Sequence, residues 1–284
     1  MSNPGLPSEH PGVHPHALLN EKVSLRQQWH ILRGFVRQDL IDRYSGSLLG
    51  GAWSLVMPLI QILIFTLIFS KIMGMKLAMF GAELTEYGYS IYLVAGVLAW
   101  NAFSTTLART SGVFLDKAGL IKKVPLSLKL LPLYIPISET VIFLIAYSFF
   151  AAFLWLIGYS FSLFWLWLPL IYFLHQLMAW AAGFFFAILS VFIRDTRQLV
   201  DVCLQVWFWG TPIVYVLDIV PERMQNLMDW NPAYWFINSY HRVILQQQAP
   251  EFNYLLLCAV SGLLFLTLAY VLLNKLERDI RDFI

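Results

Sequence analysis

The stretch LFWLWLPLIYFLHQLMAWAAGFFFAILSVFI, residues 163–193, decides the fold because it contains no Asp, Glu, Lys or Arg. A helix needs about 20 residues to cross about 30 Å of hydrocarbon, so this run is long enough to span a bilayer. The whole chain has the same character, since 59% of its 284 residues are apolar and only 13% are charged. That composition excludes an ordinary water-soluble domain. The sequence therefore predicts an all-α integral membrane protein.

Six apolar stretches are long enough to be transmembrane helices, and they predict a transmembrane domain over residues 45–274. An even number of spans places both termini on the same side of the membrane. Short loops rich in Lys and Arg stay in the cytoplasm. Of the 19 Lys and Arg residues, 15 fall on the side of the termini, leaving Lys71, Lys76, Arg223 and Arg242 on the other. Both termini are therefore expected in the cytoplasm. The six stretches are residues 53–72, 89–108, 130–157, 163–193, 198–217 and 252–274.

The segment before the first span has a different pattern. Residues 23–44 carry apolar side chains at three- and four-residue spacing, with arginines on the opposite face, which predicts an amphipathic helix lying in the membrane interface. A helix packed on a soluble partner is the alternative. Glycines after this helix predict a sharp elbow before Trp53. Residues 1–22 are expected to form a flexible cytoplasmic tail, and residues 275–284 a second cytoplasmic tail.

The last loop on the outer side, residues 218–251, is too long for a simple turn. It contains Pro221 and the pair Asn231-Pro232, followed by a cluster of aromatic residues. Short helices or a re-entrant hairpin at the outer interface fit this pattern. We expect a helical hairpin here that closes the outer mouth of a conduit. Its gating residues would be Tyr234, Trp235 and Tyr240.

Several kinds of chemistry are missing from the sequence. No Gly-rich loop ends in Gly-Lys-Ser or Gly-Lys-Thr, so no ATP site is expected in this chain. No catalytic triad or metal-binding motif is present, and we predict neither catalytic residues nor a metal site. Cys203 and Cys258 lack metal-ligand spacing, and His175 at membrane depth is read as a packing residue. A net charge of +2 excludes a polybasic surface for nucleic acid.

Only two carboxylates approach membrane depth. Asp201 follows Arg197 by four residues, which favours an ion pair within one helix, while the role of Glu139 stays open. Transporters driven by ion gradients normally carry more intramembrane charge. An energy source in another subunit is therefore the simplest reading.

A short basic segment between the second and third expected spans offers a place for that subunit. Residues 116–125 combine lysines with a small apolar ridge and end at Pro125, as a helix that docks in a groove of a soluble partner would. A simple positively charged anchor without a partner is the alternative. The candidate docking residues are Asp116, Lys117, Leu120, Ile121, Lys122 and Lys123.

Several motifs together resemble a known family, the membrane-spanning permease subunits of type-2 ABC exporters that move bacterial surface polysaccharides such as O-antigen or capsule. The most specific is DLIDRYSGSLLGGAW, residues 39–53, followed by Pro58, which is similar to the elbow of that family. VFIRD at 191–195, WFWGTPI at 207–213 and Asn231-Pro232 add to the resemblance. LIKKVP, residues 120–125, is similar to the family's coupling helix.

The resemblance implies a homodimer in the bacterial inner membrane, bound to two copies of a cytoplasmic ABC ATPase. ATP and Mg would be bound by that partner, and a lipid-linked polysaccharide would cross between the two permease chains. Exporters of a small drug, a lipid or teichoic acid are the alternatives within the family. An integral-membrane transferase acting on polyprenyl-linked sugars is the competing class, with outer-side carboxylates at Asp218, Glu222 and Asp229.

Two further hypotheses concern the path of the polymer. Arginine suits phosphate, so Arg43 at the elbow, with Tyr44 and Trp53, is expected to admit the phosphate-bearing end; a pair with Asp39 within the helix is the alternative. Aromatic rings could line the conduit with many weak contacts, although packing is the alternative for each. The candidates are Phe65, Phe69, Tyr92, Trp100, Phe103, Trp207, Trp209 and Tyr215.

Overall fold

The structure, a computed structural model, describes residues 25–43, single positions between 53 and 68, and residues 87–123, 127–217 and 220–284. Every regular element in these residues is helical, as predicted. The expected tail 1–22, the elbow after Arg43 and most of the first expected span lie outside the described residues.

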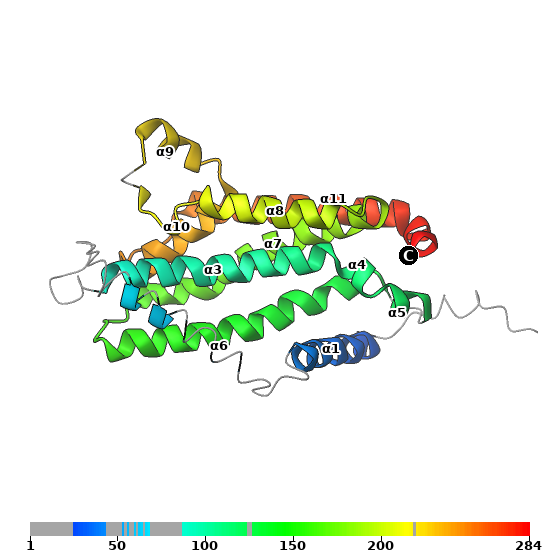
Figure 1. Cartoon of the computed structure of the whole chain (residues 1–284), viewed down its shortest axis with the longest axis horizontal. Coiled ribbons are helices and arrows are strands. Elements are labelled where there is room, and N and C mark those ends of the chain that lie inside the picture. Colours follow the sequence, from blue (N-terminus) through cyan, green and yellow to red (C-terminus); the bar gives the residue numbers. More distant parts are fainter. Residues whose placement is uncertain are drawn as a thin grey trace, which may run out of the picture.

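Four helices are long and apolar enough to cross a membrane, and they match four of the six expected spans. They are α3 (Gly88–Ser111), α6 (Tyr134–Leu156) with the 3-10 turn η4 (Leu131–Leu133), α7 (Leu168–Phe192) with η5 (Leu163–Trp167), and α11 (Phe252–Phe283). Figure 1 shows them side by side in an elongated bundle. The chain is therefore a multi-pass membrane protein.

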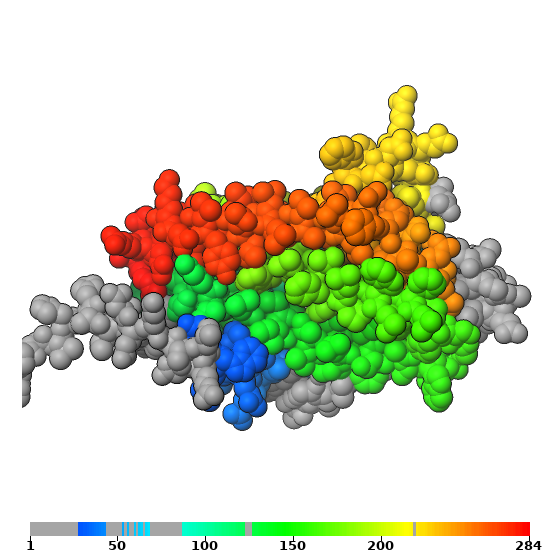
Figure 2. All heavy atoms as spheres, turned by 180° about the vertical axis from the view of Figure 1, so that it is seen from behind, coloured from blue at the N-terminus to red at the C-terminus, as the bar shows by residue number. Residues whose placement is uncertain are grey.

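The central pair of the bundle is α3 and α7. In the most apolar stretch of each, 72% of the residues are buried, compared with 33% for α6 and 22% for α11. Figure 2 shows α11 along one long face of the molecule, where its exposed side chains are apolar, for example Leu263, Leu264 and Val271. Such side chains are at home in lipid, so the outer helices shield the inner two from hydrocarbon.

The two ends of the bundle carry different short elements. One end holds α1 (Leu25–Asp42), α4 (Val113–Asp116), α5 (Ala118–Lys123) and the C-terminus, and we call it the inner end (Figure 1). The other end holds α9 (Glu222–Met228) and α10 (Pro232–Ile244), and we call it the outer end. The loop expected to form a helical hairpin therefore contains two short helices.

The expected fifth span, residues 198–217, is wrong as a continuous helix. The helix α8 (Thr196–Trp209) has 14 residues, about 21 Å, and it ends at Gly210. Pro212 lacks an amide hydrogen and disfavours a helical conformation at Thr211, which explains why residues 211–217 leave the helix. The chain then continues into α9.

The segment expected as a cytoplasmic tail, residues 275–284, is helical, because α11 continues without a break to Phe283. Leu273 and Ile280 keep the apolar spacing and are fully buried. An ion pair of 3.5 Å between Arg281 and Glu277 supports the last turns at a spacing of four residues.

The amphipathic helix is confirmed as a helix, α1, and part of its apolar face packs on this same chain. Leu32 is buried, and the ring of Phe35 stacks on Tyr134 at the start of α6, with 5.7 Å between centroids. Trp29 stays 64% exposed and is free to contact lipid headgroups. The depth of α1 in the interface stays a prediction.

Candidate functional site

The exposed face of α8 is the most unusual surface of the described residues. Only Thr196, Val200 and Leu204 are buried along this helix, at four-residue spacing. Gln198, Asp201 and Gln205 follow one another by three and four residues, so they form a stripe on one face. This polar stripe is exposed and points away from the core of the chain.

A polar stripe of this kind is costly in contact with lipid. An Asp that faces hydrocarbon is unfavourable, by up to about 2.5–3.5 kcal/mol on insertion scales when it lies at the centre of a spanning helix, and by less nearer the interface. Asp201 is exposed and has no ion pair among the residues that the structure describes, which contradicts the expected pair with Arg197. The stripe therefore requires water or a polar partner beyond the residues that the structure describes.

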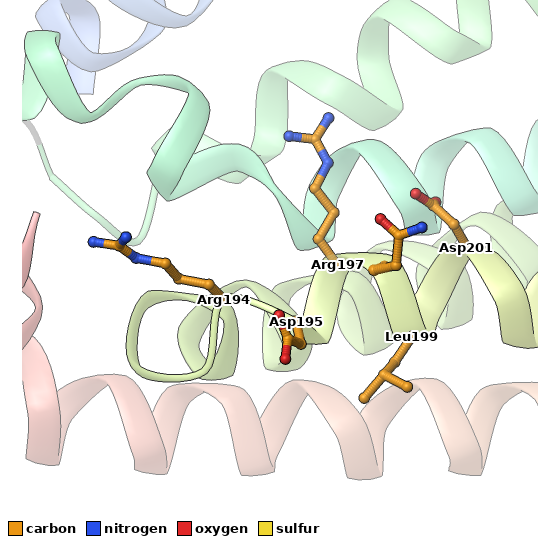
Figure 3. A pocket seen from close by; sticks show the side chains of 6 residues that line it. Arg194, Asp195, Arg197, Leu199 and Asp201 are labelled. Atoms are coloured by element: carbon orange, nitrogen blue, oxygen red, sulfur yellow. The ribbon is translucent and has the colours of Figure 1, made fainter.

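A hollow of about 620 Å³ lies at the inner end of this stripe. Figure 3 shows how its side chains spread from the start of α8: Arg197 extends toward α3 and α4, whereas Arg194 and Leu199 point in other directions. Two cations and two carboxylates line the hollow, so its wall is polar without a strong net charge. Its lining residues are Arg194, Asp195, Arg197, Gln198, Leu199 and Asp201.

The outer end of α8 is fastened by Asn231, the N-cap of α10. Its side-chain oxygen accepts from the indole nitrogen of Trp207 at 2.6 Å and from the Ala233 amide at 3.0 Å. Its amide nitrogen donates to Thr211 Oγ1 at 3.0 Å and to the Gly210 carbonyl at 3.3 Å. One side chain thus joins the end of α8, the irregular segment and the start of α10.

Replacing Asn231 with Ala should lower the free energy of unfolding by about 2 kcal/mol, because the helix cap and the partner of the Trp207 indole are lost together. Asn231→Asp keeps the accepting oxygen but loses both donated bonds, and an intermediate loss is expected. Tryptophan fluorescence during SDS titration in mixed micelles measures both. Equal stability of Asn231→Ala and the unchanged protein would show that this junction contributes nothing.

The irregular segment after α8 is also held by the first turns of α3. The Tyr92 hydroxyl lies 2.8 Å from the carbonyl oxygens of both Pro212 and Tyr215, either of which can accept its proton. The Tyr89 hydroxyl donates to the Val214 carbonyl. These bonds satisfy backbone groups that have left the helix, as a low-dielectric surrounding requires.

Four charged side chains join α1, α3 and α6 at the inner end. Arg109 donates to Glu139 at 2.6 Å and also to Asp39, and Arg43 donates to the same oxygen of Glu139. Glu139 is only 5% exposed. Glu139, whose role the sequence left open, is thus the centre of an ionic network. Arg43 and Asp39, whose pairing within one helix was the alternative to an entry role for Arg43, each bind a partner on another helix.

The structure divides the expected docking helix 116–125 into two pieces. Asp116 ends α4, Lys117 lies between the helices with its ammonium 5.7 Å from the centre of the Tyr134 ring, and α5 begins at Ala118. Ile121 is buried in this chain's own core, so it is not available to a partner, while Leu120 is half-buried and Lys122 is exposed. The side chain of Lys123 lies outside the described residues.

The aromatic residues expected to line a conduit differ in how far they are buried. Tyr92, Trp100 and Phe103 are at most 6% exposed and pack in the core, which corrects their expected exposure to a conduit. Trp207 is half-buried against Trp100 and Phe103, because the ridge of α8 meets α3 there.

The remaining aromatic candidates differ in what the structure says of them. Trp209 is 64% exposed, and the hydroxyl of the half-buried Tyr215 donates to the Trp209 carbonyl at 3.2 Å. Phe65 and Phe69 lie outside the described residues, as does Tyr44 of the expected entrance. Trp53 is partly buried at a described position. Among the described conduit candidates, Trp209 at the outer end of α8 is the ring that is exposed at the surface.

The expected gating residues belong to α10 and are buried. Tyr240 is fully buried and its hydroxyl lies 3.2 Å from His175 Nδ1, while Tyr234 and Trp235 are each 8% exposed. His241 stacks on Tyr92 and lies 3.0 Å from its carbonyl oxygen. Burial lowers the pKa of His241 to about 4, so this ring is neutral at pH 7. In this conformation α10 is a fixed part of the core, and gating stays a prediction.

Sequence reasoning missed the roles of Gln198, Gln205, Arg109 and Asn231. The three- and four-residue spacing of Gln198, Asp201 and Gln205 was a signal for the polar stripe. Asn before Pro was a signal for a helix cap. No local signal could pair Arg109 with Asp39, which lies 70 residues away along the chain.

A bundle of long apolar helices defines a multi-pass membrane protein. Residues 32–245 match the ABC-2 type transporter family. Since the match covers most of the chain, the protein belongs to this family, and the resemblance drawn from its motifs is confirmed.

Relatives with assigned names cover nearly the whole chain. Two proteins of Klebsiella pneumoniae, each named O-antigen export system permease protein RfbA, are 26% identical to it; the matches cover 91% and 90% of this chain and 96% and 95% of theirs. A protein of the same name from Myxococcus xanthus is 23% identical, over 84% of this chain and 90% of its own.

Proposed function

We propose that this chain is the permease of an ATP-driven exporter that moves lipid-linked polysaccharide of the O-antigen kind across the bacterial inner membrane. The polymer would pass through a channel between two copies of the chain, with both termini in the cytoplasm. Membership of the ABC-2 type transporter family and the names of three relatives that match most of the chain support this assignment.

The observation that carries the channel is the polar stripe of α8. Gln198, Asp201 and Gln205 point away from the chain's own core, so a second copy facing them would enclose a polar path. Gln and Asp side chains bind hydroxyl groups, and Trp209 and Tyr215 add aromatic surface at the outer end. Many weak contacts suit a sliding polymer, because a single tight site would arrest it.

The energy would come from two copies of a cytoplasmic ABC ATPase that bind ATP and Mg. The inner end offers them α5 with the exposed Lys122 and the half-buried Leu120. The phosphate-bearing end of the substrate would enter near Arg43, Tyr44 and Trp53. Arg43 shares Glu139 with Arg109, so a phosphate group that binds Arg43 competes with this carboxylate.

Changing Asp201 to Leu distinguishes a lipid-facing stripe from a channel-facing stripe. We expect this variant to insert normally and to lose most surface polysaccharide, because an apolar wall replaces a hydrated one. The experiment uses a strain that lacks the gene for this protein and accumulates lipid-linked polymer. Each variant is expressed in this deletion strain, and the amount of polysaccharide at the cell surface is measured. The neighbouring exposed change Val202→Leu is the control and should restore export.

Two results would contradict the proposal. Full export by Asp201→Leu, with a stability gain of the size expected for removing a lipid-facing carboxylate, would place the stripe in lipid. Unchanged surface polysaccharide in the deletion strain would remove the substrate assignment. Turnover of polyprenyl-linked sugars by the purified chain alone would instead support the transferase alternative.

A further inference from the structure

An ion pair joins α8 to α4, the single helical turn that precedes the docking helix α5. Arg197 Nη1 donates to Asp116 Oδ1 at 2.7 Å, and these residues are 81 positions apart in the chain. Gly112, at the start of α4, makes room for this contact. A Cβ atom there would lie 3.1 Å from the guanidinium carbon of Arg197. Figure 3 shows Arg197 extending toward α3 and α4 from the start of α8.

The two helices that this pair connects are held very differently. Val113 and Phe114 of α4 are fully buried, and the Phe114 ring packs 6.2 Å from that of Phe184 on α7. In contrast, α8 buries only a narrow ridge on the rest of the chain. The helix α4 is therefore anchored in the core, directly before α5 in the chain. At the inner end of α8, the Asp116–Arg197 pair is a direct connection through which α8 can follow.

The contribution of the Asp116–Arg197 pair to the stability of the fold is small. Both side chains are about half exposed, 48% for Arg197 and 46% for Asp116, and exposed pairs contribute about 0.2–1 kcal/mol. The same pair has strict geometry, because the guanidinium lies against the backbone at Gly112 and binds one carboxylate oxygen. Such a contact links the start of α8 directly to α4, although it adds little to the stability of the fold.

We infer that Arg197 is a positioning residue that transmits movement of the ATPase-docking segment, α4 and α5, through Asp116 to α8. The inference rests on the proposed function, because it assigns the ATPase to α5 and the channel to α8. Without the pair, ATP hydrolysis continues while α8 follows less faithfully. The amount of ATP hydrolysed per polymer exported then rises.

The experiment uses the full chain with its ATPase in inside-out membrane vesicles supplied with lipid-linked polysaccharide from the deletion strain. ATP hydrolysis and polymer export are measured together. For Arg197→Gln and for Asp116→Asn we expect at least about a fivefold rise in ATP hydrolysed per polymer. The exchanged pair, Arg197→Asp with Asp116→Arg, should recover much of the original ratio. Arg194→Gln is the matched control, since Arg194 lines the same hollow and has no ion pair among the described residues.

A second measurement does not depend on transport. Cys203 is exposed on α8 and Cys258 is buried, so a maleimide dye will label α8 selectively. Trapping the ATPase with ADP and vanadate should change the labelling rate of Cys203 in the unchanged protein. In Arg197→Gln this change should disappear, and in Arg194→Gln it should persist.

The outcomes separate this inference from the proposed function. If the unchanged complex exports no polysaccharide, the proposed function fails. If it exports normally and Arg197→Gln keeps both the original ratio and the nucleotide-dependent labelling of Cys203, the inference is overturned while the function stands. If Arg197→Gln does not assemble with the ATPase, Asp116→Asn and the exchanged pair, Arg197→Asp with Asp116→Arg, decide the question. If the exchanged pair does not recover the original amount of ATP hydrolysed per polymer, the inference is also overturned.

Discussion

Replacing Glu139 with Ala should lower the free energy of unfolding by about 3–5 kcal/mol, because it leaves two arginines without their shared carboxylate in a largely buried setting. Glu139 is 5% exposed and accepts from both Arg43 and Arg109, whose side chains are 24% and 28% exposed. Two desolvated cations about one carboxylate repel each other once it is removed. SDS titration in mixed micelles, followed by tryptophan fluorescence, measures the loss.

The matched control is Glu251→Ala. Glu251 also binds an arginine, Arg242, at 3.0 Å, but Glu251 is 41% exposed at the outer end. An exposed pair of this kind contributes about 0.2–1 kcal/mol. If Glu139→Ala costs no more than Glu251→Ala, the network at the inner end is solvated like a surface pair. If Glu139→Ala does not insert into the membrane, Asp39→Asn is measured instead. This variant should lose less free energy of unfolding than is expected for Glu139→Ala, because Arg109 still has Glu139 as its ion-pair partner.

The long helices could be predicted from the sequence because crossing the hydrocarbon core of a bilayer requires a long run of apolar residues. Each of α3, α6, α7 and α11 contains an apolar stretch that only a helix can carry through hydrocarbon. The ends were less predictable. Pro212 breaks the expected fifth span, and the buried Leu273 and Ile280 extend the last helix beyond the apolar run.

Ionic partners could not be predicted in the same way. Spacing of four residues favoured Arg197 with Asp201 and offered Asp39 with Arg43 as an alternative, since local pairs are the ones that a sequence reveals. The structure instead joins Arg197 to Asp116, because the turn after α7 brings the start of α8 beside α4. Pairs between helices depend on packing, and no spacing rule encodes it.

Aromatic residues were the least informative part of the sequence. Trp100, Phe103 and Trp209 have the same chemical character, yet the first two are buried and Trp209 is 64% exposed. Rings fill the core of a helical bundle as readily as they line its surface. The polar residues of α8 indicated the outward face more reliably, because a Gln or Asp at membrane depth needs a reason to be there.

The helices α3 and α7 approach each other closely at Gly183. A Cβ atom at this position would lie 2.7 Å from the Thr110 Cβ atom and 2.8 Å from the Leu107 carbonyl oxygen. Both contacts are shorter than carbon and oxygen atoms tolerate, and one involves backbone that cannot rotate away. The two central helices would have to separate, and the packing on both sides of them would loosen.

Gly183→Ala should therefore lower the free energy of unfolding by about 1–3 kcal/mol, despite the better helix propensity of Ala. The matched control is Gly34→Ala in the exposed part of α1, where no atom lies within 4 Å of the added Cβ. That change should stabilise α1 by up to about 1 kcal/mol. The same substitution is thus expected to have opposite signs at the two positions, as measured by SDS titration.

A double variant tests the stated cause of the Gly183 effect. Thr110→Gly removes the Thr110 Cβ atom but leaves the Leu107 carbonyl in place, so it should relieve part of the clash in Gly183→Ala and none of the backbone contact. The coupling between the two changes should be favourable and incomplete. If the losses of stability of the two single variants simply add, α3 and α7 do not meet at these atoms. If Gly183→Ala stabilises the protein, the helices lie farther apart than the distance of 2.7 Å between the added Cβ atom and the Thr110 Cβ atom implies.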